Sequence, residues 1–319
     1  MVKKYPSGEL EQLSQQQMEA EVDALLEQYL KENMDRRDES PARFAYLYRR
    51  LRTTLLFLLR RLGAEMAQSR FVPAAFELPV SRDKGVPPLE LTSEDGVRVL
   101  LEGTVDRVDV YSCPEDEREY IRVVDYKSGR KQFDLNELLS GLEMQMPIYL
   151  FTLCRGEGDR PIPAGVLYMP ARAEAVEAGR EDTPEKVKEA FEGRMRMNGL
   201  LLMDYQVLEA MEEDLKGRFI PVKKTASGIG AQYKKNVATP EEWEVLRGYV
   251  AKKSTEMADR LHRGEIDDVP LLSREGRLAC EYCEYQAVCG HEDDSLKRRE
   301  SPGLPREEVL NRMREEQQK

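Results

Sequence analysis

The stretch that decides the fold begins at Gly103-Thr-Val-Asp106 and continues, one hairpin later, with Val123-Val-Asp125-Tyr126-Lys127-Ser-Gly129. Alternating apolar and polar residues predict a strand over residues 97–110, and a second strand is predicted over Tyr120–Lys127. Side chains two apart on a strand share a face, and a neighbouring strand places its side chains ~5 Å away. We therefore expect Asp106, Asp125 and Lys127 to lie together at one end of a hairpin.

Two carboxylates beside an ammonium group suit phosphodiester hydrolysis. Carboxylate oxygens are hard ligands for Mg²⁺ (or Mn²⁺), which keeps most of its waters and bridges to phosphate. The lysine can assist an attacking water or stabilise charge in the transition state. The simpler interpretation is an exposed Asp–Lys ion pair, which is common in a chain with 34% charged residues. The apolar run Ile121, Val123 and Val124 favours catalysis, because it places the charges at the end of a buried strand.

Composition bounds the class of protein. The chain has 319 residues, 40% of them hydrophobic, which is enough for one large domain or two modest ones. No stretch approaches the ~20 apolar residues of a membrane span, and the N-terminus lacks a signal-peptide core. We therefore expect a soluble, cytoplasmic protein that does not bind a membrane.

Charge and motif content exclude several functions. The 49 basic and 60 acidic residues give a net charge of −11, which argues against coating nucleic acid by bulk charge but allows a local basic groove. The two histidines, His262 and His291, lie in no recognisable motif. The chain has no G-x-x-x-x-G-K-[ST] sequence, so we expect no ATP hydrolysis by this chain.

Helical and extended patterns alternate along the chain. Residues 8–66 read as helix, with Ser14-Gln-Gln-Gln17 as a capping box. A further helix begins with the capping box Asp134-Leu-Asn-Glu137 and runs toward Cys154, with an interruption or kink expected at Pro147. The order helix, strands, helix, strand indicates a mixed α/β layer fold. We expect an N-terminal helical region over 1–69, a main domain over 70–292 and a charged tail over 293–319.

The helix after the hairpin adds a polar pair. Gln145 and Tyr149 are four residues apart and share one face of a helix. Their simpler interpretation is ordinary surface and core packing. The functional interpretation is a pair that orients the lysine or a phosphate.

Together these motifs resemble the PD-(D/E)xK nuclease superfamily, in its RecB-like branch, and within it the C-terminal nuclease domains of the AddB type of helicase/deoxyribonuclease subunit. The similarity runs from about Phe71 to His291. It implies a restriction-endonuclease-like fold, a mixed sheet flanked by helices. It also implies Mg²⁺-dependent DNA exonuclease activity in DNA-end processing for double-strand-break repair and recombination, with an AddA-type partner subunit.

The resemblance implies a role for each matched residue. Asp106 and Asp125 resemble the metal-binding acids and Lys127 the catalytic lysine, while the backbone carbonyl of Tyr126 would be a further metal ligand. The helical polar pair matches the accessory motif after the core. Glu77 stands where such proteins often carry an acid on the first strand.

Three cysteines form a second specific signal. Cys280-x₂-Cys283-x₅-Cys289 brings three thiols within ten residues, a spacing typical of one soft metal centre. Zinc completed by His291 is one alternative. The cluster also resembles the last three cysteines of the [4Fe–4S] staple of AddB and Cas4-like nucleases. The fourth cysteine of that staple lies upstream in the family, whereas no cysteine precedes Cys113 here. We expect an incomplete ligand set, in a chain that corresponds to the C-terminal part of a longer subunit.

Three other interpretations remain open. A stand-alone Cas4-like nuclease shares both sets of motifs. A non-catalytic module that binds DNA ends, or a scaffold, would keep the fold without cleavage. A purely structural interaction protein would leave the Asp-x-Lys and accessory motifs unexplained.

Overall fold

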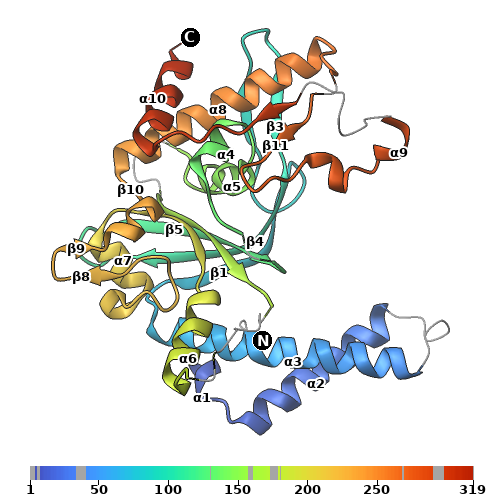
Figure 1. Ribbon diagram of the computed structural model, residues 1–319, viewed down its shortest axis with the longest axis vertical. Helices are drawn as coiled ribbons and strands as arrows, with labels where there is room; N and C mark the ends of the chain where they lie inside the picture. The colour runs from blue at the N-terminus through green and yellow to red at the C-terminus, as the bar shows by residue number, and fades with distance from the viewer. Residues whose placement is uncertain are drawn as a thin grey trace.

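A six-stranded mixed sheet forms the centre of the structure, with strand order β1-β4-β5-β6-β7-β10 (Figure 1). The computed structural model describes residues 4–5, 8–33, 41–129, 131–156, 161–172, 179, 181–267, 269–289 and 298–318. The β5–β6 and β7–β10 pairs are parallel and the other neighbours are antiparallel. The strands are β1 (Val72–Val80), β4 (Gly103–Ser112), β5 (Glu119–Lys127), β6 (Ile162–Pro170), β7 (Asn198–Leu202) and β10 (Val237–Ala238).

Three two-stranded ribbons lie outside the central sheet. They pair β2 (Leu89–Thr92) with β3 (Arg98–Leu101), β8 (Lys224–Thr225) with β9 (Gly228–Ile229), and β11 (Leu271–Leu272) with β12 (Arg299–Glu300). The prediction of one strand over residues 97–110 is therefore wrong at Glu102, which separates β3 from β4. The segment changes partners there, because β3 pairs with β2 while β4 joins the central sheet.

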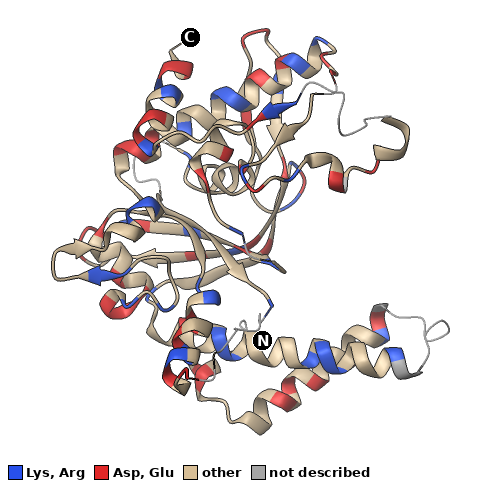
Figure 2. Cartoon of the chain, viewed as in Figure 1, with Lys and Arg blue, Asp and Glu red and all other residues tan. Residues whose placement is uncertain are grey.

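The N-terminal helices form an elongated hairpin that extends from the body of the protein (Figure 1). Gln17 Oε1 accepts a hydrogen bond from the backbone N–H of Ser14 at 2.9 Å, and Ser14 Oγ accepts one from the N–H of Gln17 at 3.3 Å, which confirms the predicted capping box. Figure 2 marks acidic residues along one helix and basic residues along the other. Arg52, for example, lies 2.5 Å from a carboxylate oxygen of Asp23. The helices are α1 (Glu9–Gln12), α2 (Gln15–Asn33) and α3 (Pro41–Gln68).

The helical segment after the β4–β5 hairpin is split in two, as α4 (Leu135–Leu139) and α5 (Gln145–Leu153). The break lies before Pro147 and includes two residues with positive φ, Gly141 at 89° and Glu143 at 54°. The expected kink at Pro147 is wrong, because this proline lies in the first turn of α5, where its missing N–H removes no helical hydrogen bond. Asp134 caps α4 as predicted, but Glu137 accepts from the N–H of Arg274 instead of closing the box.

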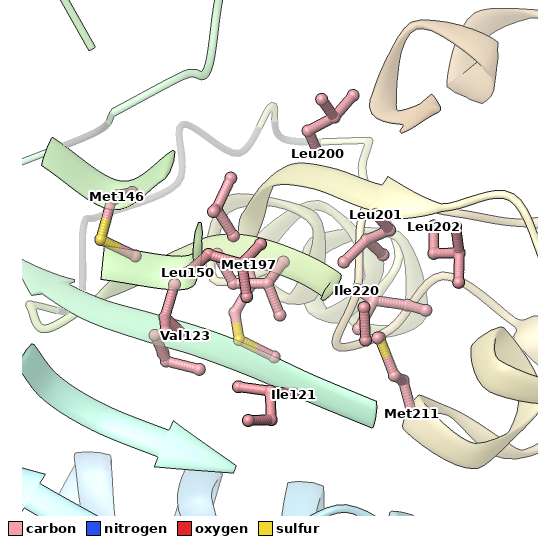
Figure 3. Packing of buried hydrophobic residues seen from close by; sticks show 14 of the residues in the cluster. Ile121, Val123, Met146, Leu150, Met197, Leu200, Leu201, Leu202, Met211 and Ile220 are labelled. Carbon is pink, nitrogen blue, oxygen red and sulfur yellow. The ribbon is translucent and has the colours of Figure 1, made fainter. Parts of the chain in front are cut away.

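The hydrophobic core surrounds the middle of the sheet. All residues of β6 except the two at its ends are buried, as expected for a strand covered on both faces. Figure 3 shows Val123 of β5 next to Leu150 of α5, and Ile121 and Met146 belong to the same buried core. The helix α5 contacts both β5 and β6. This packing fixes α5 against the strand that ends in Asp125 and Lys127.

The remaining helices complete the layers around the sheet. The helix α10 packs along α8 and buries Val309, Leu310 and Met313, so the described part of the predicted tail over 293–319 includes a packed helix. The division of the chain at residues 69 and 292 stays a prediction. No helix in the described ranges is both long enough and apolar enough to span a bilayer. The helices are α6 (Pro184–Arg194), α7 (Tyr205–Met211), α8 (Pro240–His262), α9 (Gln286–Cys289) and α10 (Arg306–Gln317), with 3₁₀ turns η1 (Glu213–Leu215), η2 (Ala231–Asn236) and η3 (Ala279–Tyr282).

A buried group of four charged side chains joins α3 to the sheet. Glu65 of α3 lies 3.1 Å from Arg107 of β4 and 2.5 Å from Arg122 of β5. Asp109 of β4 lies 2.7 Å from Arg107 and 2.8 Å from Arg122. All four side chains are at most 1% exposed, and their charges sum to zero. We call these residues the buried quartet; it ties the N-terminal helices to the same two strands that carry Asp106 and Asp125.

Candidate active site

The two predicted acids lie opposite each other on neighbouring strands. Arg107 of β4 pairs with Val124 of β5, so the next antiparallel pair in this register is Asp106 and Asp125. The Asp106 carboxylate also accepts a hydrogen bond from the backbone N–H of Tyr126 at 2.9 Å. The side chain of Asp106 is thus held against the end of β5 by a backbone donor. The structure brings the two acids together as the sequence predicts.

Lys127 completes the group on the same face of β5. Its Nζ atom lies 2.7 Å from Oδ2 of Asp125, and its side chain is 37% exposed against 8% for Asp125. Oδ2 of Asp125 is buried, and the Lys127 ammonium is the close charged partner that the described residues give it. Burial raises the pKa of Asp125, and the charge of Lys127 offsets this only in part. The arrangement is a buried, incompletely compensated carboxylate beside an accessible amine.

This pair of carboxylates fits a hard divalent cation. Mg²⁺ is commonly held by one or two protein carboxylates and fills its remaining positions with water and substrate oxygens. Lys127 offsets only part of the burial of the Asp125 carboxylate, so a cation beside Asp106 and Asp125 would compensate the rest. No group of three His, Cys, Asp or Glu side chains within the described ranges has a metal-binding arrangement. The backbone carbonyl of Tyr126 as a further ligand stays a prediction.

The predicted acid of the first strand, Glu77, lies beside this pair. The register pairs Phe76 with Arg107 and Leu78 with Val105, which leaves Glu77 opposite Asp106. Glu77 is exposed, and its φ of 48° is unusual for a residue other than glycine. Within the described ranges its side chain is not gathered with Asp106 and Asp125 into a metal-binding group of three, and its role stays a prediction.

The accessory pair contacts the backbone of β4. Tyr149 Oη accepts hydrogen bonds from the N–H of Thr104 at 3.2 Å and from Gln145 Nε2 at 3.3 Å. A Cβ atom on Gly103 would lie 2.2 Å from the same hydroxyl, so only glycine lets the tyrosine approach this closely. The contacts of this pair thus fix the beginning of β4, two residues before Asp106, and the orientation of Lys127 or a phosphate by the pair stays a prediction.

Sequence reasoning missed a second polar group at this end of the sheet. Tyr168 of β6 pairs with Asp125 in the β5–β6 register, and its hydroxyl donates to Glu143 at 2.5 Å. Burial raises the pKa of Tyr168, and the negative charge of Glu143 raises it further. Glu143 is also ion-paired with Lys131, which is 42% exposed. No spacing in the sequence indicates this group, because it depends on the parallel pairing of strands separated by α4 and α5.

The three clustered cysteines belong to different secondary-structure elements. Cys280 lies in η3, Cys283 directly follows it, and Cys289 ends α9. Cys280 is partly exposed and the other two are exposed. Among the described residues, the three thiols do not form a group that could bind one metal ion. His291 lies outside the described residues. A zinc or [4Fe–4S] site at these cysteines stays a prediction that rests on spacing and resemblance.

Comparison with known proteins gives one consistent family. The family model of the PD-(D/E)XK nuclease superfamily matches residues 8–290. The B subunit of the ATP-dependent helicase/deoxyribonuclease of Caldanaerobacter subterraneus subsp. tengcongensis is 30% identical over 294 residues, covering 89% of this chain and 25% of that protein. Proteins of the same name from Thermoanaerobacter sp. (strain X514) and Clostridium novyi are each 29% identical, covering 88% and 81% of this chain and 25% and 23% of their own lengths.

The chain spans about a quarter of the length of these curated relatives. The match nevertheless covers all six strands of the central sheet and the whole β4–β5 hairpin. The predicted family and the predicted restriction-endonuclease-like α/β fold are both confirmed. With its mixed sheet, its paired acids and a family match that extends over residues 8–290, the chain belongs to the PD-(D/E)XK nuclease superfamily.

Proposed function

We propose that this chain is a divalent-metal-dependent deoxyribonuclease that hydrolyses phosphodiester bonds at DNA ends. The observation that carries this proposal is the convergence of Asp106, Asp125 and Lys127 at one end of the β4–β5 hairpin in a chain of this superfamily. Burial of Asp125 is only partly offset by Lys127, and incompletely compensated acids of this kind are common at functional sites.

Each side chain has a distinct part in this reaction. Asp106 and Asp125 would hold the cation, with Asp106 kept in place by the Tyr126 N–H. A Mg²⁺ or Mn²⁺ ion at these acids would supply Lewis-acid activation of the phosphate and of a water. Lys127, the accessible member of the group, donates to the attacking water or to the phosphate oxygens as negative charge develops. Tyr149 holds the beginning of β4 in place by accepting from the N–H of Thr104.

The biological setting follows from the names of the relatives. Those proteins are B subunits of an ATP-dependent helicase/deoxyribonuclease, and this chain matches about a quarter of their length. We propose that it acts as the nuclease part of such a complex, with exonuclease action in DNA repair and recombination and an AddA-type subunit as partner. We propose a cytoplasmic location to match this setting.

The cysteine set does not fit a four-cysteine cluster by itself. Cys280, Cys283 and Cys289 supply three thiols, while Cys113 and Cys154 are buried elsewhere in the fold. We therefore assign no step of the reaction to a cluster. A [4Fe–4S] group at these cysteines would require a fourth ligand from outside this set, and iron analysis with visible absorption of the aerobically and anaerobically purified chain tests for it.

Degradation of end-labelled linear DNA tests the proposed reaction. The unmodified chain should shorten labelled DNA in Mg²⁺ and not in EDTA, and Asp125→Ala should abolish the cleavage. Asp83→Ala is the matched control, because Asp83 is an exposed acid of the loop after β1 and has no ion pair among the described residues. Thermal melting of each variant should show that both remain folded.

The outcomes separate the alternatives. Labels at the 5′ or 3′ end distinguish exonuclease from endonuclease products. Cleavage lost in Asp125→Ala but kept in Asp83→Ala supports the proposal. Metal-independent DNA binding without cleavage by the folded chain would instead support a non-catalytic end-binding module.

A further inference from the structure

A small pocket opens directly beside Lys127, on the side away from β4. Its polar lining consists of Lys127, Lys131, Gln132, Tyr168, Arg196 and Asn198. Three of these side chains are cationic, and no Asp or Glu is among the described residues that line the pocket. Two of the three cations have carboxylate partners, since Lys127 pairs with Asp125 and Lys131 with Glu143. The charge of Arg196 is therefore left in excess, which suits an anion.

Asn198 and Arg196 are held in position in this pocket, and each keeps hydrogen-bond donors that have no partner among the described residues. Asn198 Oδ1 accepts from the N–H of Phe133 at 3.0 Å, which holds the amide and leaves its NH₂ group without a partner among the described residues. Arg196 donates from Nη1 to the carbonyl of Gly217 at 3.3 Å, and its guanidinium lies 5.3 Å from the Tyr233 ring centroid. The other guanidinium nitrogens have no ion-pair partner in the described part of the chain. A guanidinium held in this way can bind phosphate through two parallel hydrogen bonds.

The strand register shows where the pocket lies relative to Asp125. Asp125 pairs with Tyr168, and Tyr168 pairs with Asn198. Asn198 is thus two strands from Asp125, a separation of about 10 Å. Lys127 belongs both to the candidate active site and to the pocket. A short stretch of DNA backbone that placed one phosphate at the acids would extend along this line to the pocket.

We propose that this pocket binds a phosphate of the DNA strand that flanks the scissile phosphate, with Arg196 and Asn198 as positioning residues. The inference rests on the proposed function and adds a specific contact to it. Phosphate contacts fix the register of a nucleic acid on a protein without reading its sequence. Arg196 therefore sets which phosphodiester lies at Asp106 and Asp125, and it acts without touching the reacting atoms.

Binding of phosphate-modified DNA tests this proposal. A labelled single strand of about twelve nucleotides is bound to the full chain carrying Asp125→Asn, which prevents cleavage during the measurement. In a series of strands, one phosphate at a time is replaced by an uncharged methylphosphonate. We expect one linkage whose neutralisation weakens binding about tenfold, the effect of losing one charge-assisted hydrogen-bonded contact.

The variant pair makes the assignment specific. Adding Arg196→Gln, which removes the guanidinium and its charge but keeps a polar side chain, should remove the sensitivity to that one linkage. Arg118→Ala removes an exposed arginine of the β4–β5 loop and should leave the sensitivity intact. Arg196→Lys should restore part of it, because the charge returns without the two parallel donors. Thermal melting identifies any variant that unfolds, and Asn198→Ser then replaces it in the series.

Each result decides the proposal separately from the nuclease assignment. A linkage effect lost in Arg196→Gln supports the pocket even if the unmodified chain does not cleave DNA. A linkage effect that persists in Arg196→Gln, or the absence of any such linkage, overturns the pocket even if cleavage requires Asp125. Equal effects of Arg196→Gln and Arg118→Ala would show only general charge attraction and would also overturn it.

Discussion

Glu65 is the residue whose loss should reveal how the N-terminal helices hold the catalytic strands. It is the only member of the buried quartet that comes from α3, and it contacts both arginines. Glu65→Gln keeps the shape of the side chain but replaces one carboxylate oxygen with an NH₂ group. That group would face guanidinium donors, and the quartet would be left with two positive charges and one negative charge in a buried site.

The magnitude follows from the contacts that are lost. Glu65 accepts hydrogen bonds from Arg107 at 3.1 Å and from Arg122 at 2.5 Å, and its side chain is 1% exposed. Removing one partner of a buried, hydrogen-bonded ion pair costs about 3–5 kcal/mol. A folded domain is stabilised by about 5–15 kcal/mol in total, so the expected loss is a large fraction of it. Glu189→Gln on the exposed side of α6 is the matched control and should change stability by less than ~0.5 kcal/mol.

The pH dependence provides a second measurement on the same variant. Burial would raise the pKa of Glu65, but Arg107 and Arg122 outweigh it and hold this pKa below its ordinary value of 4.5. The stability that ionised Glu65 contributes is therefore complete above pH 4.5 and is lost as the pH falls through the lowered pKa. Urea unfolding should show a constant difference between Glu65→Gln and the unmodified chain down to this pH and a shrinking difference below it. A difference under 1 kcal/mol at neutral pH would refute the reasoning.

Three further changes test other parts of the fold. Gly103→Ala places a Cβ atom 2.2 Å from Tyr149 Oη and should cost about 1–3 kcal/mol in urea unfolding; an unchanged midpoint would contradict the close approach. Met313→Ala in α10 removes a fully buried side chain and should cost about 2–5 kcal/mol; a loss below 1 kcal/mol would mean that α10 contributes little to the core. Asp125→Asn should raise the melting temperature in EDTA at neutral pH. The pKa of Asp125 is raised in the folded protein, so the stability that its protonated form contributes is lost as the pH rises through that pKa. Equal melting temperatures of the two proteins would contradict this.

The sequence was sufficient to predict those parts of the candidate site whose residues are close together in the chain. Asp106, Asp125 and Lys127 lie within a single hairpin, so the alternation of side chains along two adjacent strands was enough to bring them together. The capping box at Ser14 was equally local and is confirmed. In each case the residues concerned are close in sequence, and the interaction depends only on the conformation of the intervening segment.

The features that the sequence did not predict depend on long-range pairing. Glu65 is separated from Arg107 by a whole strand and the β2–β3 ribbon, and its charge looks like any other on a helix. The break between β3 and β4 at Glu102 also depends on long-range pairing. Apolar and polar residues alternate on both sides of Glu102, but β3 pairs with β2 while β4 pairs with β1 and β5. Periodicity shows which residues share a face but does not identify the partner strand.

The β4–β5 hairpin carries charge on both faces, and the difference between the faces explains where chemistry takes place. Successive strand residues point to opposite sides, so Arg107 lies with the buried quartet while Asp106 faces Asp125. On the quartet face, two cations balance two anions and the group is electrically complete. On the other face, Lys127 pairs with Asp125, while Asp106 accepts from the backbone N–H of Tyr126. Burial and the nearby charge of Asp106 disfavour ionised Asp125, and Lys127 offsets this only in part. A cation at this face would therefore stabilise the folded protein, whereas the quartet needs no further partner.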